Sequence, residues 1–230
     1  MNYAPQSNAV DKIEKLKILA LHGYRQNEQT FRQKTGSFRK VVNKWAEFTY
    51  LNAPHKVTNF DNGQSQDDQQ YSWFFNKEDR TFSGIRLGGP AIGFEESVRL
   101  IEENYEKLGP FDGIWGFSQG ACFVGLLCDL QQRGLLKTKF NFAILVAGFK
   151  SNSIAHSQYF KKSNNVSSLH VFGIGDQVIP VEMSVALSNC FENPVIVRHE
   201  GGHFVPASSK EKEAYQNFFR TRYELKNLSS

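Results

Sequence analysis

The stretch Gly113-Ile114-Trp115-Gly116-Phe117-Ser118-Gln119-Gly120 places a short apolar run directly before a serine that lies between two glycines. A run of small and apolar residues follows it to Gln132 and predicts a buried helix. A GxSxG pattern between a strand and a helix is typical of a nucleophile elbow, a tight turn that raises the serine hydroxyl above a sheet. The five residues alone also occur by chance in glycine-containing turns, so the strand before them and the helix after them carry the interpretation.

Outside this stretch, short apolar runs alternate with longer amphipathic segments. Six runs, several of them continuous in β-branched and aromatic residues, predict strands buried on both faces: Leu16–Leu21, Glu47–Leu51, Gly113–Trp115, Phe142–Ala147, Leu169–Phe172 and Val195–Arg198. Helices are predicted over Thr30–Ala46, Ile92–Leu108, Gln119–Gln132, Pro180–Asn189 and Ser208–Tyr223. This order predicts an α/β fold in which a mostly parallel sheet of about six strands is flanked by helices.

The chain has 230 residues, of which 40% are hydrophobic and 22% are charged, as expected of one globular domain over residues 1–230. Residues 54–92 interrupt the alternation of strands and helices as a long loop insertion. This insertion is polar at Asp61–Gln70 and becomes aromatic at Tyr71–Phe75. Loops of such length are commonly functional or disordered.

Several function classes are disfavoured by composition. No apolar run reaches the roughly 18 residues of a spanning helix, so we expect no membrane span. The net charge of +4 is spread along the chain, which does not suggest nucleic-acid binding. The three cysteines, Cys122, Cys128 and Cys190, lack CxxC spacing, which argues against a disulfide framework or a zinc site. Because the first residues also lack a signal-peptide pattern, we expect a cytoplasmic protein with neither metal nor cofactor.

A serine needs a base to become a nucleophile, and in a fold of this kind the base is a histidine that follows an acid in the chain. The histidines after Ser118 are His156, His170, His199 and His203. His170 lies inside a predicted strand and His156 in a polar loop, so neither is favoured. His203 follows Gly201 and Gly202, which permit the loop to turn the imidazole back over the serine. We therefore predict His203 as the base, with His199 as the rival.

The acid is expected at the carboxyl end of a strand between the serine and the histidine. Asp176 fits because it follows an apolar strand and two glycines. Asp129 and Glu182 fall inside predicted helices, and Glu200 is too close to His203 in the chain. The alternative for Asp176 is a purely local role as a helix cap or an Asx turn.

Two backbone N–H groups are expected to stabilise an oxyanion. One belongs to Gln119, at the start of the helix that follows the serine. The other is predicted at Tyr24, in the loop after the first core strand, where Gly23 allows a close approach. His22 precedes the serine, so we expect it to shape this loop rather than to act as the base. Cys122 is expected to be a buried thiol on the helix after Ser118.

Blocks of sequence that occur in a fixed order carry a resemblance to a known family: Leu21–Asn27, Phe31–Gly36, Gly116–Ala121, Gly175–Asp176 and Gly201–Pro206. Together they resemble the FSH family of serine hydrolases, most closely its branch of ovarian-cancer-associated gene 2 esterases, over about Leu16 to Tyr223. The resemblance implies a compact α/β-hydrolase fold and a carboxylesterase without cofactors, associated with long-chain alkyl esters. It also implies that Ser118 is the nucleophile, Asp176 the orienting acid and His203 the base.

The expected function is that of a serine carboxylesterase that acts on medium- to long-chain esters through an acyl-enzyme. Its expected partner is a small-molecule ester, and no oligomeric state is predicted. Trp73, Phe74 and Phe75 are candidates for the wall of an acyl pocket, although ordinary core packing explains such an aromatic run equally well. A thioesterase or an amidase could use the same three residues, and a non-catalytic binding protein could keep the fold.

Overall fold

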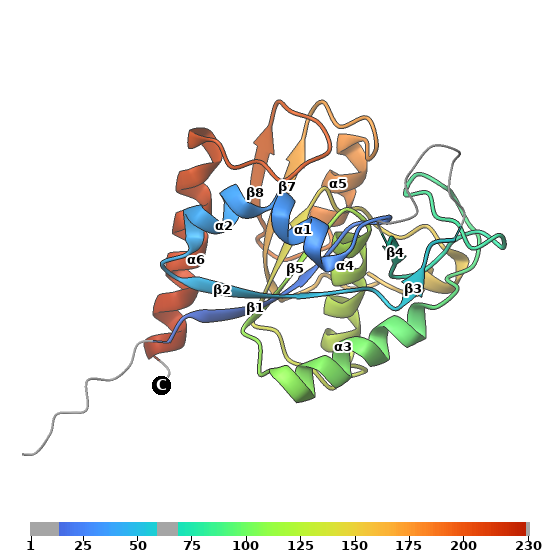
Figure 1. The fold of residues 1–230 in the computed structure, drawn as a ribbon, viewed down its shortest axis with the longest axis horizontal. Coiled ribbons are helices and arrows are strands. Elements are labelled where there is room, and N and C mark those ends of the chain that lie inside the picture. Colours follow the sequence, from blue (N-terminus) through green and yellow to red (C-terminus); the bar gives the residue numbers. More distant parts are fainter. Residues whose placement is uncertain (1–13, 59–68, 229–230) are drawn as a thin grey trace, which may run out of the picture.

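A central six-stranded sheet organises the part of the chain that the computed structural model describes, residues 14–58 and 69–228 (Figure 1). Every pair of neighbouring strands is parallel, in the order β2-β1-β5-β6-β7-β8. The strands are β1 (Leu16–Leu21), β2 (Ala46–Leu51), β5 (Gly113–Phe117), β6 (Phe142–Val146), β7 (Ser167–Gly173) and β8 (Val195–His199). The predicted parallel α/β sheet is therefore confirmed.

Helices cover both faces of this sheet, which gives three layers (Figure 1). One face packs against α1 (Glu28–Lys34), α2 (Gly36–Val42) and α6 (Ser209–Leu228). The other face packs against α3 (Phe94–Leu108), α4 (Gln119–Gln132) and α5 (Val181–Ser188). A short 3₁₀ turn, η1 (Ile154–His156), lies between β6 and β7.

The continuous apolar runs are explained by this double coverage. In β5, Ile114 belongs to the core cluster beneath α4, whereas Trp115 and Phe117 belong to the cluster beneath α1, α2 and α6. Trp115 is fully buried, and its ring lies 4.9 Å from that of Phe31 and 4.7 Å from that of Phe38. A strand that is covered on both faces has no solvent side, so it shows no alternation of polar and apolar residues.

The single helix predicted over Thr30–Ala46 was wrong, because the segment forms α1 and α2 and ends before β2. Asn27 caps α1, since its Oδ1 accepts a hydrogen bond of 2.7 Å from the Thr30 N–H, and the helix begins at Glu28. The break falls at Thr35, whose hydroxyl donates to the Phe31 carbonyl at 2.6 Å. A threonine hydroxyl that bonds its own backbone competes with a continuing helix.

The described parts of the insertion, residues 54–58 and 69–92, contain more secondary structure than the predicted loop. Two short strands, β3 (His55–Lys56) and β4 (Tyr71–Ser72), pair antiparallel, and Phe75 bridges to Ile92. The helix predicted from Ile92 begins at Phe94, because Gly93 adopts a left-handed φ of 85°. Most of the polar segment predicted at Asp61–Gln70 lies outside the described residues. Among the helices that the structure describes, none has both the length and the apolar character to cross a membrane.

Candidate active site

The backbone of Ser118 is held in a strained conformation at the junction of β5 and α4. Its φ of 54° and ψ of −116° are unusual for a residue other than glycine. The Ser118 N–H donates to the Val146 carbonyl at 2.8 Å, which anchors the turn to β6. A Cβ on Gly120 would lie 2.4 Å from the Leu21 carbonyl oxygen, so the flanking glycine is required for this close approach. The turn therefore has the geometry predicted from the GxSxG pattern.

Ser118, His203 and Asp176 meet at the carboxyl edge of the sheet. With Asp176 ionised, the His203 Nδ1–H donates to its Oδ2 at 2.7 Å. His203 Nε2 then accepts the Ser118 hydroxyl hydrogen bond at 2.9 Å. The three residues follow β5, β7 and β8, and the carboxyl ends of parallel strands share one edge of a sheet. The structure thus brings together the serine, histidine and acid that the sequence singled out.

Asp176 is oriented by its own loop as well as by the histidine. Its Oδ1 accepts hydrogen bonds from the Val178 N–H at 2.8 Å and the Ile179 N–H at 2.9 Å. This leaves Oδ2 directed at His203. The local Asx-type turn and the bond to the histidine, which the sequence posed as alternatives, are both present. The side chain is 2% exposed, so this carboxylate is largely shielded from water.

The loop that carries His203 is tied to the loop that carries Asp176. The Ile174 N–H donates to the His199 carbonyl at 2.8 Å, and the Gly175 N–H donates to the Gly201 carbonyl at 3.1 Å. The ring of His203 also packs 4.9 Å from the Phe117 ring, directly before the serine. These contacts fix the imidazole between its two partners, while its side chain keeps 18% exposure.

The other histidines occupy structural positions. His22 is fully buried: its Nδ1 donates to the Gly23 carbonyl at 2.8 Å, and its Nε2 accepts from the Ala53 N–H at 3.0 Å. Burial lowers the pKa of His22 to about 4, so the ring is neutral near pH 7. His199, the rival base, packs its ring 5.1 Å from Phe204, beneath the loop that carries His203. His156 is buried in η1, not in an open polar loop, and burial lowers its pKa to about 4.

Both segments expected to supply oxyanion donors lie beside Ser118. Gln119 is the first residue of α4, and N–H groups in the first turn of a helix have no partner within that helix. In the loop after β1, a Cβ on Gly23 would lie 3.3 Å from the Ser118 Cβ, so this backbone passes close to the serine. Tyr24 follows directly. The assignment of the Tyr24 and Gln119 N–H groups as oxyanion donors stays a prediction.

Trp73, Phe74 and Phe75 are fully buried. The Trp73 ring stacks on Phe123 at 5.2 Å, and the Phe74 ring packs edge-on against Phe82 at 5.3 Å. These contacts correspond to the core-packing alternative. A role in the acyl pocket stays a prediction for all three.

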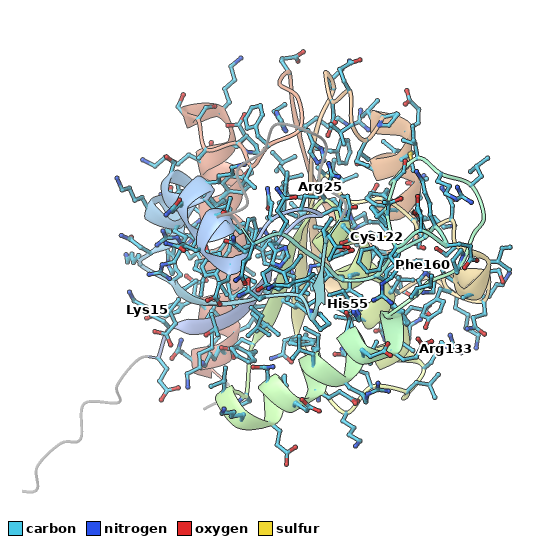
Figure 2. All side chains as sticks on the ribbon, turned by 45° about the vertical axis from the view of Figure 1, so that its right-hand side comes forward. Lys15, Arg25, His55, Cys122, Arg133 and Phe160 are labelled. Carbon is cyan, nitrogen blue, oxygen red and sulfur yellow. The ribbon has the colours of Figure 1, made fainter. Side chains whose placement is uncertain are left out.

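The three cysteines are free thiols in the described chain. Cys122 lies inside the molecule on α4 (Figure 2), where burial raises the pKa of its thiol. Burial also raises the pKa of Cys128 to about 12. Cys190 is only partly buried. Within residues 14–58 and 69–228, no group of three or more His, Cys, Asp or Glu side chains is arranged to hold a metal ion.

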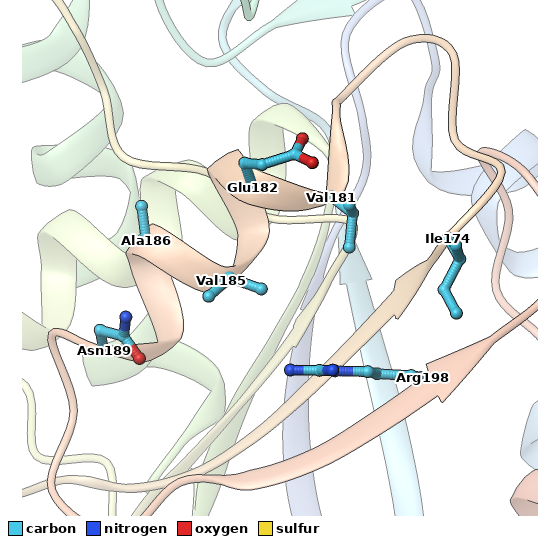
Figure 3. Close-up of a pocket in the computed structure, with 7 residues that line it drawn as sticks. All are labelled: Ile174, Val181, Glu182, Val185, Ala186, Asn189 and Arg198. Atoms are coloured by element: carbon cyan, nitrogen blue, oxygen red, sulfur yellow. The ribbon is translucent and has the colours of Figure 1, made fainter.

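A cavity of about 430 Å³ lies between α5 and the edge strand β8 (Figure 3). Val181 and Val185 line it from the helix, and the Arg198 side chain extends beneath them from the strand. Ile174 closes one end, two residues before Asp176. The lining includes neither Ser118 nor His203, so this cavity is separate from the candidate active site.

Two interactions of this site could not be predicted from the sequence. The side chain of Gln119 bonds to residues 72–74 of the insertion, and the Trp73 indole bonds to the His22 carbonyl. The sequence carries no signal for such pairings, because the partners are about 50 residues apart in the chain.

The chain is similar to known proteins over most of its length. The serine hydrolase (FSH1) family model matches residues 11–215. An esterase of Anopheles gambiae is 50% identical over 212 residues, which cover 92% of this chain and 79% of that protein. Esterase OVCA2 of Danio rerio is 42% identical over 219 residues, covering 89% and 96%, and the Homo sapiens protein of that name is 36% identical over 215 residues, covering 88% and 95%.

Solved structures of low sequence identity share the fold. Arabidopsis thaliana SOBER1 superimposes with a TM-score of 0.61 at 18% identity, covering 91% of this chain and 99% of that one. Zea mays acyl-protein thioesterase 2 gives a TM-score of 0.62 at 16% identity, covering 93% and 96%. The family match and the sequence identities to the esterases show more than a shared fold, because they establish family membership. This chain belongs to the FSH1 family of serine hydrolases.

Proposed function

We propose that this protein is a serine carboxylesterase whose catalytic triad is Ser118, His203 and Asp176. The observation that carries the proposal is the continuous pair of hydrogen bonds, 2.9 Å from Ser118 to His203 and 2.7 Å from His203 to Asp176. Membership of a serine hydrolase family and relatives named esterases support the same reaction class.

In the first half-reaction the Ser118 Oγ attacks the ester carbonyl carbon while His203 Nε2 takes the hydroxyl proton. Asp176 keeps the other imidazole proton on Nδ1 and stabilises the imidazolium. The N–H groups of Tyr24 and Gln119 donate to the tetrahedral oxyanion, where loss of one donor costs about 100-fold or more in rate. The intermediate collapses, the C–O bond to the alcohol breaks, and His203 returns the proton to the leaving oxygen.

In the second half-reaction water hydrolyses the acyl-enzyme. His203 takes a proton from the water as its oxygen attacks the acyl carbonyl, and the same two N–H groups stabilise the new oxyanion. Collapse breaks the bond to the Ser118 Oγ, which recovers its proton from His203, and the carboxylic acid leaves. These steps use only protein groups and water.

The proposed substrates are medium- to long-chain esters. The resemblance to the branch associated with long-chain alkyl esters supports this preference. The half-buried Phe82 ring lies 5.5 Å from the Tyr24 ring and 6.1 Å from that of the buried Phe149, so a row of aromatic rings leads from the proposed oxyanion loop into the core. We propose that Phe82 contributes to the acyl wall, beside the predicted Trp73–Phe75 segment. A single domain over residues 1–230 and a cytoplasmic location stay predictions.

Ser118→Ala tests the proposed function directly. Hydrolysis of a soluble short ester such as p-nitrophenyl butyrate should fall to background, while the circular dichroism spectrum and melting temperature remain those of the folded protein. Turnover by the folded variant at more than a few per cent of the wild-type rate would overturn the assignment. A matched panel of esters and thioesters of equal acyl length then separates the carboxylesterase from a thioesterase.

A further inference from the structure

The segment Tyr71–Phe74 of the insertion lies between the two backbone segments expected to supply oxyanion donors. On one side it contacts the loop after β1, and on the other it contacts the first residue of α4. Ser72, Trp73 and Phe74 are all fully buried there. Because this buried segment contacts both the loop after β1 and the start of α4, its contacts can set the distance between these two parts of the chain.

The side chain of Gln119 makes the contact to α4. Its Oε1 accepts from the Trp73 N–H at 3.0 Å. Its Nε2 donates to the Phe74 carbonyl at 2.7 Å and to the Ser72 hydroxyl at 3.1 Å. Gln119 is fully buried, and its amide uses both hydrogens and an acceptor on this one segment. Buried amides with satisfied hydrogen bonds are rigid, and breaking one bond leaves a costly unpaired group.

Trp73 and Tyr71 make the contacts to the other loop. The Trp73 indole Nε1–H donates to the His22 carbonyl at 2.8 Å. The Arg25 N–H donates to the Tyr71 carbonyl at 3.0 Å, and the Tyr71 N–H donates to the Gln26 carbonyl at 2.9 Å. These bonds hold the backbone on both sides of Tyr24. Arg25 has a positive φ of 59°, a conformation that such neighbouring bonds must maintain.

We infer that Gln119 and Trp73 form a brace that fixes the separation of the two oxyanion donors. The side chain of Gln119 and the indole of Trp73 are positioning residues: they act through the N–H groups of Gln119 and Tyr24 and do not touch the reacting atoms. This inference rests on the proposed function. It assigns the Trp73 indole a role in catalytic rate in place of the acyl-pocket role predicted for it from the sequence, and Phe82 keeps its proposed place in the acyl wall.

The brace predicts a specific kinetic pattern. Displacement of an oxyanion donor by a fraction of an ångström affects the transition state more than the bound ester, so kcat should fall while KM stays nearly constant. The loss should also be the same for acetate, butyrate and decanoate esters. A residue of an acyl pocket would instead lose more activity on the longer chains.

Three variants test the brace. Trp73→Phe keeps an aromatic ring and removes the indole N–H together with part of the ring system. Gln119→Met keeps a side chain of similar length and removes the amide. Phe123→Leu is the matched control, because Phe123 is fully buried against the Trp73 ring but has no part in these hydrogen bonds. If Gln119→Met fails to fold, Gln119→Glu retains the acceptor for Trp73 and removes the donor to Phe74.

Trp73→Phe and Gln119→Met should each lower kcat by about 10- to 100-fold with KM within about twofold, since a small misplacement of catalytic groups costs that order of rate. The affinity for a trifluoromethyl ketone, which adds Ser118 to form a hemiketal oxyanion, should fall in parallel with kcat/KM. The affinity for the matched methyl ketone should not change. Phe123→Leu should lower the melting temperature and leave kcat within about threefold.

Two results would overturn the brace. One is a wild-type kcat in folded Trp73→Phe and in a folded Gln119 variant. The other is a loss that grows with acyl length, which would assign Trp73 to the acyl pocket instead. Either result leaves the proposed function intact if Ser118→Ala is inactive. Turnover by Ser118→Ala is the separate failure that removes the esterase mechanism itself.

Discussion

Asp176 Oδ2 lies 2.7 Å from His203 Nδ1, while the other oxygen of that carboxylate is held by two backbone N–H groups of its own loop. Oδ1 is therefore occupied by the loop, and Oδ2 is the carboxylate oxygen that bonds to the imidazole. This fixes which ring nitrogen carries the proton, because an ionised carboxylate only accepts hydrogen bonds. Nε2 is left as the acceptor that faces Ser118.

Asp176→Asn should keep the fold and lower kcat by about 10,000-fold, the loss typical of a triad whose histidine is held in the wrong tautomer. An asparagine amide can donate a hydrogen bond to Nδ1 of His203, which moves the imidazole proton to Nε2. A protonated Nε2 cannot accept the proton of the Ser118 hydroxyl. Steady-state kinetics with a soluble ester measure the effect, and the melting temperature reports the fold. A loss smaller than about tenfold would show that Asp176 does not set the tautomer.

His203→Gln and His199→Gln should separate the two histidines at the end of the sheet. Removal of His203 takes away the base and should lower kcat by about 10,000-fold or more. His199 packs beneath the same loop without a hydrogen bond to Ser118 in the described structure, so its variant should stay within about tenfold of wild type. Comparable losses in both variants, at equal melting temperature, would contradict the assignment of the base.

Gly120→Ala should destabilise the fold strongly. A Cβ there would lie 2.4 Å from the Leu21 carbonyl oxygen and 2.5 Å from that of His22, and both are backbone atoms. The expected loss is about 3 kcal/mol or more in the free energy of unfolding, measured in urea. Gly134→Ala is the control, because Gly134 has a φ of +70° but open space around it. Gly134→Ala should lower the free energy of unfolding by about 1 kcal/mol. Equal losses at the two glycines would show that a Cβ at position 120 is not crowded by the backbone.

His170 should contribute to the loss of stability in acid. Burial in β7 lowers the pKa of His170 from 6.5 to about 3. As pH falls from 6.5, the unfolded chain binds a proton at this site that the folded chain does not, so the free energy of unfolding decreases. His170→Leu should reduce the fall in stability between pH 6.5 and pH 4 by roughly 1 to 3 kcal/mol. Parallel stability curves for variant and wild type, from urea unfolding at each pH, would contradict this sign.

Most of the fold could be predicted from the sequence because the strands of the sheet are buried on both faces. Such strands appear as continuous apolar runs, as at Phe142–Val146, and the glycines beside Ser118 mark the turn that follows β5. The helix over Thr30–Ala46 was wrong because the break at Thr35 depends on a side-chain hydrogen bond and not on hydrophobic periodicity. The local hydrophobic pattern predicts which strands and helices form, whereas the residues at which they end depend on side-chain contacts.

The three residues of the candidate site could be identified because each follows a strand in the expected order. The bond between Trp73 and the His22 carbonyl could not, because it joins an irregular insertion to a loop 51 residues earlier. An aromatic run is compatible with a core, a pocket or a brace, and only its contacts distinguish them. The hydrogen bonds of the Gln119 amide could not be predicted either, because a GxSxG pattern does not specify the residue after the serine.

The most direct test is covalent labelling with a fluorophosphonate probe, followed by mass spectrometry of the labelled peptide. We expect one adduct, on Ser118, which is absent in Ser118→Ala and forms far more slowly in His203→Gln. An adduct on another residue, or labelling of Ser118 that does not depend on His203, would contradict the claim that these side chains make one nucleophile.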